Sequence, residues 1–319
     1  MSSNVRQLAA NLPRQGGLSN RNMVINGDFS VWQRGTSWAV GQSGYKADRY
    51  QDQNNAAFER STDAPDGFKY SAYIHSWNGG AHQLNHHIEN TGQFYVGQVL
   101  TISMYAKANR NGVGIKMGAL YSPSDTASVV STDAVLKTLT TDWQRYTTTV
   151  TINSNWSGNS SSLMTYPYGN LSDTELGWTT SDWIRITGFQ IEVGDTATPF
   201  EHRSYGQELA LCQRYYFRKS YPNDRHLGNG RWEGSSVSGT VFFPQTMRTT
   251  PTVTANTTGM RAVNPTVAWY SLNSLNQVHK TGTQSLEMFF SASASGDNKG
   301  TSVIDFDTGG FVAFDAEVS

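Results

Sequence analysis

Apolar and polar residues alternate with a period of two along most of the chain from residue 23 onward. Successive residues of a strand face opposite sides of a sheet, so this alternation indicates half-buried strands. Glycine- and asparagine-rich segments between the runs supply turns. Residues 21–203 are therefore expected to hold roughly eight to ten antiparallel strands in a two-sheet β-sandwich, most simply a jelly roll. The clearest runs are 68–75, 100–106, 114–121, 143–152 and 183–193.

One segment instead shows helical spacing. Ser204 suits an N-cap, and Gln207 stands three residues later, where a capping box places Glu or Gln. Leu209, Cys212 and Tyr216 then recur at helical intervals. The spacing predicts a helix over 204–217, within a connector that spans 204–220.

Strand-like runs return beyond residue 221. Pro244 and Pro251 bracket a short segment where strands should stop. Residues 221–319 are therefore predicted to form a small C-terminal β-sandwich tip, which makes the whole chain all-β. The predicted strands are 237–243, 252–258, 267–272, 286–292, 301–306 and 311–318.

Composition narrows the function classes. The net charge is −1 and only 15% of the residues are charged, so the chain has no basic face for nucleic acid. Cys212 is the single cysteine, which rules out an intrachain disulfide. No apolar run reaches the roughly 18–20 residues of a membrane span. The N-terminus does not resemble a signal peptide, so we expect synthesis in a cytoplasm and no membrane insertion.

Residues 1–20 differ from the rest. They hold Arg6 and Arg14 but no acidic residue, and Leu8 and Leu12 frame a short apolar cluster. One interpretation is a frayed terminus. The other is an anchor that orders on a larger particle through coupled folding and binding.

Three blocks of the sequence carry a family resemblance. They are residues 22–35 (NMVINGDFSVWQRG) with 47–50 (ADRY), residues 188–216 (GFQIEVGDTATPFEHRSYGQELALCQRYY), and residues 243–254 (FPQTMRTTPTVT) with 315–318 (DAEV). In this order they resemble bacteriophage tail-fibre or receptor-binding proteins, in which a carbohydrate-module-like jelly roll precedes a C-terminal β-tip. The resemblance spans about residues 22–319, and its third block is the least specific.

The resemblance implies a homotrimer on the virion whose tip contacts the host surface, with residues 1–20 docking on other phage proteins. A small β-domain also has exposed edge strands, whose unpaired backbone groups can pair with other chains. Three chains around an axis would cover these edges. The apolar stripe of the predicted helix would then face the trimer axis through Leu209, Cys212 and Tyr216. The alternative is that this stripe packs within one chain.

The resemblance also implies two kinds of site. Modules of this type often hold a structural calcium, for which Asn26, Asp28 and Glu192 would supply oxygen ligands. Asn26 and Asp28 equally suit a turn, and Glu192 a solvated position. Sugar binding in such modules uses exposed aromatic faces, and four aromatic residues lie in a loop-rich region; the alternative is that they are buried or lie between subunits. These four are Trp156, Tyr166, Tyr168 and Trp178.

No catalytic motif is found. The sequence lacks a Gly-x-Ser-x-Gly elbow, a phosphate-binding glycine loop and a His-Glu-x-x-His motif. His82, His86 and His87 resemble a metal-ligand spacing, but without a neighbouring carboxylate they indicate a solvated strand face.

We therefore predict a non-enzymatic tail-fibre or receptor-binding subunit that adheres to a host-surface glycan or protein. The alternatives are a capsid head-fibre or decoration protein of the same architecture, and a secreted carbohydrate-binding module.

Overall fold

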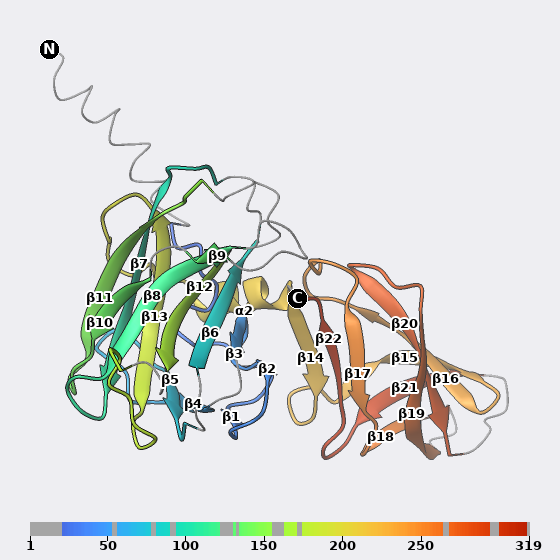
Figure 1. Cartoon of the computed structure of the whole chain (residues 1–319). Helices are drawn as coiled ribbons and strands as arrows, with labels where there is room; N and C mark the ends of the chain where they lie inside the picture. The colour runs from blue at the N-terminus through green and yellow to red at the C-terminus, as the bar shows by residue number, and fades with distance from the viewer. Residues whose placement is uncertain are drawn as a thin grey trace, which may run out of the picture. The chain divides into compact units, whose positions relative to one another are not determined.

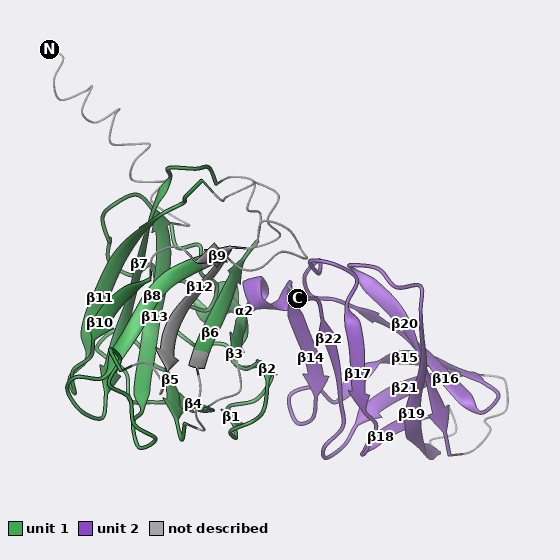
Figure 2. Cartoon of the chain, in the orientation of Figure 1, with its two compact units in different colours: residues 1–208 green, residues 209–319 purple. Residues whose placement is uncertain are grey.

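The structure is a computed structural model that divides into two compact units, residues 1–208 and residues 209–319 (Figures 1 and 2). The boundary lies inside the helix that was predicted as the connector, five residues beyond the predicted end of the jelly roll. The residues described are 21–52, 56–77, 81–89, 94–121, 130–131, 134–154, 163–170, 174–263, 268–293 and 300–317.

The first unit is a two-sheet sandwich (Figure 1). Sheet A contains, in spatial order, β1 (Ser37–Trp38), β4 (Ala57–Ser61), β5 (Ser71–His75), β13 (Ile184–Val193), β7 (Val99–Ala108) and β11 (Gln144–Thr151). Sheet B contains β10 (Val135–Thr138), β8 (Gly114–Tyr121), β12 (Leu163–Asn170), β6 (Ala81–Ile88), β3 (Tyr50–Asp52) and β2 (Gly44–Tyr45), with β9 (Val130–Ser131) paired to β8. The chain passes repeatedly from one sheet to the other, and all pairings are antiparallel, which confirms the predicted all-β jelly-roll sandwich.

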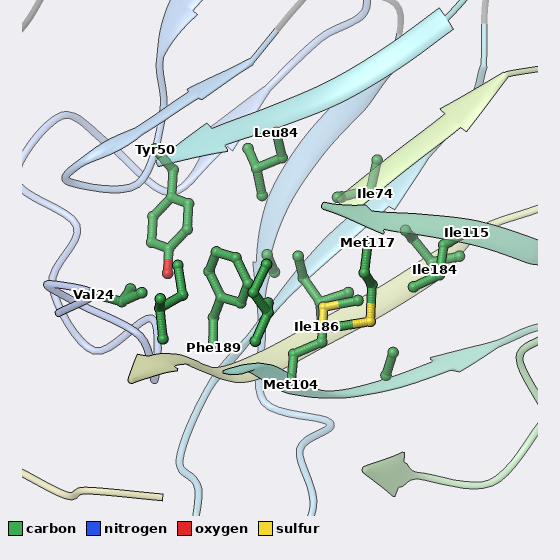
Figure 3. Packing of buried hydrophobic residues seen from close by; sticks show 14 of the residues in the cluster. Val24, Tyr50, Ile74, Leu84, Met104, Ile115, Met117, Ile184, Ile186 and Phe189 are labelled. Atoms are coloured by element: carbon green, nitrogen blue, oxygen red, sulfur yellow. The ribbon is translucent and has the colours of Figure 1, made fainter. Parts of the chain in front are cut away.

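Apolar side chains from both sheets form one continuous core (Figure 3). Tyr50 of β3 and Phe189 of β13 come from opposite sheets, and their ring centroids lie 6.4 Å apart. Phe29 stacks on Tyr50 at 4.4 Å, so the N-terminal segment supplies part of this core. Buried apolar area of this kind is the main stabilising contribution to a sandwich.

The predicted helix is present as α2 (Tyr205–Gln213). The capping box is reciprocal, because Ser204 N donates to Gln207 Oε1 at 2.9 Å and Gln207 N donates to Ser204 Oγ at 3.3 Å. The helix ends earlier than predicted, since Tyr216 begins β14 (Tyr216–Ser220). Among the described residues, no helix is long and apolar enough to cross a membrane.

The assignment of a trimer interface to the helix is wrong at two of three positions. Cys212 is 0% exposed and Tyr216 is 7% exposed within a single chain, so neither offers a surface to a second chain. Tyr216 pairs with Asp315 of a neighbouring strand rather than extending the helical stripe. Leu209 is half-buried.

In the second unit six strands form a closed barrel, where a small sandwich was expected. The barrel runs β15 (His226–Glu233), β16 (Ser236–Phe242), β20 (Ser285–Ala292), β19 (Trp269–His279), β18 (Met260–Val263) and β21 (Thr301–Phe306). It closes because β21 pairs with both β15 and β18, and closure removes the barrel's edges. The edge strands that are left belong to a three-stranded sheet of β14, β22 (Phe311–Asp315) and β17 (Thr252–Asn256).

Gly27 lies where the N-terminal segment crosses β13. Its carbonyl accepts a hydrogen bond from Phe189 N at 2.8 Å, and a Cβ at residue 27 would stand 2.2 Å from Phe189 O. We expect Gly27→Ala to lower the free energy of unfolding by about 1–3 kcal/mol, because the two backbones must separate to admit the methyl group. Denaturant unfolding followed by tryptophan fluorescence measures this loss.

The matched control is Gly206→Ala, in the first turn of α2. No atom lies within 4 Å of the added methyl group, and alanine favours a helix over glycine by about 1 kcal/mol. Stability should be unchanged or higher in this variant. Equal unfolding midpoints for Gly27→Ala and the wild type would contradict the close-contact argument.

Candidate functional site

The central strand β6 of sheet B is buried on both faces. Leu84 and Ile88 join the sandwich core. Three polar residues alternate with them on the opposite face: Gln83 at 9% exposure, Asn85 at 6% and His87 at 5%. The outer face of an antiparallel sheet is commonly solvated, so a buried polar row there calls for an explanation.

Neighbouring strands extend this row across the sheet. Gln51 of β3 stands opposite Asn85 in the register, and Tyr45 of β2 stands opposite Gln51. His87 Nε2 lies 3.3 Å from Gln51 Oε1, and its ring centroid lies 6.4 Å from that of Tyr45. The Arg34 guanidinium lies over the Tyr45 ring at 5.2 Å. We call Arg34, Tyr45, Gln51, Gln83, Asn85 and His87 the sheet-B face.

Asn85 brings an unpaired acceptor to the sheet-B face. Asn85 Oδ1 is buried and accepts no hydrogen bond. A buried acceptor without a donor costs about 1–3 kcal/mol, and a ligand that donates a hydrogen bond to it would recover part of that cost. Tyr45 and Gln51 beside it are only half-buried, so the face is open toward β2 and β3.

The other face of β6 holds the N-terminal segment. His86 is fully buried, and its Nε2 lies 3.2 Å from Ile25 N and 3.1 Å from Ile25 O. Burial lowers the pKa of His86 well below its usual range, and the charge of Arg49 lowers it further. His86 is therefore neutral near pH 7. The solvated strand face expected for these histidines is wrong at His86 and His87, which are both buried because β6 is a central strand.

The proposed calcium ligands serve their own chain. Asn26 Oδ1 accepts from Val31 N at 2.8 Å. Both Glu192 oxygens accept from Thr198, at 2.8 Å from its N and 2.7 Å from its Oγ1. Asp28 Oδ1 accepts a backbone N–H two residues on. Within the described ranges, no three His, Cys, Asp or Glu side chains gather where they could hold a metal. Calcium at Asn26, Asp28 and Glu192 stays a prediction.

The four aromatic residues proposed for sugar binding lie in different surroundings. Trp178 is wrong as an exposed platform: it is 7% exposed, meets Trp77 edge-on at 4.1 Å, and donates from Nε1 to Gly114 O at 2.6 Å. Tyr166 and Tyr168 belong to β12, where Tyr168 stands opposite Gln83 in the register. Trp156 lies outside the described residues, as do the proposed anchor residues Arg6, Leu8, Leu12 and Arg14.

Sequence reasoning missed Asn85, Gln51 and Tyr45. The alternation in His82-Gln83-Leu84-Asn85-His86-His87 predicted a strand with two distinct faces. It did not show that both faces would be buried, because that depends on which strands flank β6.

Several solved structures are similar to part of this chain. The xylan-binding CBM22-1 domain of Paenibacillus barcinonensis Xyn10C matches at 12% identity, over 51% of this chain and 94% of its own, with a TM-score of 0.34. A CBM4 module matches at 22% identity, over 54% and 99%, with a TM-score of 0.32. The enzymatically active domain of bacteriophage CBA120 tailspike protein 4 matches at 12% identity, over 54% and 21%, with a TM-score of 0.35.

No protein-family model matches the chain, and no curated protein matches it significantly. The TM-scores of the similar structures are too low to bear on function. The fold assignment rests on the strand pairings of the chain itself.

The burial of neutral His86 predicts a pH dependence of stability. In the unfolded chain this histidine binds a proton near pH 6.5, and in the folded chain it does so only at much lower pH. The unfolded state therefore holds more protons below pH 6.5, and stability falls as the pH drops. The slope is about 1.4 kcal/mol per pH unit. Unfolding free energies measured between pH 7.5 and 5 test this.

His86→Gln removes the titrating group, so its stability should fall less steeply below pH 6.5 than that of the wild type. The control is His202→Asn, which replaces an exposed histidine of the same unit and keeps His86, so the fall in stability assigned to His86 should remain. Parallel curves for the wild type and His86→Gln would refute the assignment of the slope to His86.

Proposed function

We propose that the chain is a non-catalytic adhesion protein that binds a glycan on the sheet-B face. The observation that carries this proposal is the unpartnered, buried Oδ1 of Asn85 within a row of polar side chains. A sugar hydroxyl is a donor that fits this acceptor. Because Asn85 Oδ1 is already shielded from water, a hydrogen bond from a sugar hydroxyl forms without the cost of first removing water from this oxygen.

The surroundings of Asn85 suit a carbohydrate. Gln51, Gln83 and His87 surround it with polar side chains, and Tyr45 is half-buried at the open side. Strands lie about 4.8 Å apart, so a glycan that crosses β2, β3 and β6 meets a polar or aromatic side chain at each strand. A ligand reaches Asn85 only by displacing the side chains that shield it.

The setting of this adhesion comes from the sequence resemblance. Residues 22–319 resemble phage tail-fibre and receptor-binding proteins, which supports a place on a virion appendage, a homotrimer, and docking to other phage proteins through residues 1–20. Three copies of a weak glycan site then bind together with a gain in avidity. A capsid head fibre or a secreted carbohydrate-binding module would use the same sheet-B face.

Asn85→Ala tests the site. Because Oδ1 makes no hydrogen bond within the protein, its removal should leave folding nearly unchanged but weaken glycan binding at least tenfold. The wild type is first screened on a printed array of bacterial capsular polysaccharides and lipopolysaccharides. The strongest binder is then titrated calorimetrically into the wild type and the variant.

The control is Gln144→Ala, which removes an exposed amide from edge strand β11 of sheet A and should bind as the wild type does. Equal affinities for the wild type and Asn85→Ala would refute the sheet-B face as the site. Binding to none of the arrayed glycans would refute glycan adhesion to this class of surface.

The oligomeric state tests the appendage proposal separately. We expect light scattering after size exclusion to give the mass of three 35.2 kDa chains, because fibre proteins of the kind this sequence resembles are trimeric. A mass of one chain across the accessible concentrations would favour a single carbohydrate-binding module. This measurement does not depend on Asn85.

A further inference from the structure

Two segments about 180 residues apart lie side by side where the first unit begins and ends. They are residues 22–26, which lead into the jelly roll, and residues 201–208, which lead out of it into α2. Asn22 N donates to Glu201 Oε2 at 2.7 Å. Asn26 N donates to Glu208 Oε2 at 2.8 Å. These bonds join the two ends of the unit directly, outside either sheet.

Arg203 links the same segments at their centre. Its Nη1 donates to Val24 O at 3.1 Å, and its Nη2 donates to Asn22 O. The same Nη1 lies 3.0 Å from Glu208 Oε1. The planar guanidinium presents several donors in a fixed geometry, so one side chain joins two backbone carbonyls to a carboxylate. A lysine cannot reproduce this fork.

These contacts are shielded from water. Asn22 and Glu208 are each 4% exposed and Asn26 is fully buried, while the Arg203 side chain is 10% exposed. Charge-assisted hydrogen bonds are roughly twice as strong as neutral ones. Removing one partner from a buried ion pair is strongly destabilising, because it leaves the other charge buried without compensation. The contacts are therefore strong, and they lie beside the hydrogen bonds that tie the same segment to β13, from Met23 N to Ile191 O and from Ile191 N to Asn22 Oδ1.

We infer that residues 22–26 and 201–208 form a mechanical clasp, which carries tension between the N-terminal segment and α2. Tension applied at residues 21 and 209 loads the Arg203, Glu201 and Glu208 hydrogen bonds together with the bonds that anchor Asn22 and Met23 to β13. While these bonds hold, the strands between them are not pulled apart. Once they break, the unit releases about 600 Å of chain.

The benefit of such a clasp to the protein rests on the proposed adhesion function, because a subunit fixed at its N-terminus and bound to a host surface is pulled. The mechanical behaviour itself does not depend on that function. A glycan site on the sheet-B face would stay folded under load for as long as the clasp holds.

Single-molecule optical tweezers on the full chain, with handles at the two chain ends, test the inference. Release of the first unit is recognised as a single step of about 600 Å, longer than the step from the 111 residues of the second unit. For Arg203→Lys we expect the rate of this step at constant force to rise at least tenfold.

The control is Arg110→Lys. Arg110 forms a comparable fork within the same unit, to Asp182 at 2.8 and 2.7 Å and to Gly177 O, but it lies outside the path between residues 21 and 209. Thermal unfolding of both variants measures the general loss of stability. If the two variants lose the same thermal stability, only Arg203→Lys should raise the rate at which the first unit unfolds under force.

Equal acceleration in the two variants would overturn the clasp, since the effect would then follow overall stability. Release of the wild-type unit in a series of short steps would also overturn it, because the strands would then be loaded from the start. Equal glycan affinities for the wild type and Asn85→Ala, or no glycan binding by the wild type, would leave these force measurements unaffected, so the two proposals are tested apart.

Discussion

The first unit depends on how the backbone of residues 22–26 is hydrogen-bonded. This segment belongs to neither sheet, yet it is largely buried, so its N–H and C=O groups need partners from elsewhere. Asn22 and Asn26 bond to Glu201 and Glu208, Met23 N donates to Ile191 O, and Ile25 meets His86. The side chains of Glu201, Glu208 and His86 thus supply hydrogen-bond partners that a neighbouring strand would otherwise supply.

This requirement accounts for the most distinctive parts of the sequence. Residues 22–35 and 188–208 carry much of the family resemblance, and the structure brings them together at one end of the sandwich. Gly27 allows the closest approach, because a side chain at that position would collide with Phe189 O. Asn26 holds the following turn by bonding to Val31 N and to Val31 O. The sequence pattern of these two segments therefore reflects a packing constraint.

Period-two alternation was enough to predict the sandwich and strands such as β5, β7, β8, β11 and β13, because alternate burial is a local property of a half-buried strand. It did not predict β14, β15 or β18. The alternation could not predict that the second unit closes into a barrel, because closure depends on β21 pairing with both β15 and β18. Tyr216 continues the helical spacing, yet it belongs to β14, since pairing with β22 outweighs local preference. Trp178 lies in a polar stretch of the sequence, yet it is buried, because the fold packs it against Trp77, which is distant in the sequence.

The sheet-B face could not be predicted from the sequence for a related reason. Nothing local distinguishes Asn85 from any polar residue on a solvated strand face. Its significance comes from the central position of β6 and from an acceptor that the fold leaves unpaired. On the opposite face of β6, His86 holds Ile25, next to the residues that bond to Arg203. The strand that carries the proposed glycan site is therefore braced by the segment that carries the proposed load, and a bound ligand and a pulled N-terminus act on one connected part of the sandwich.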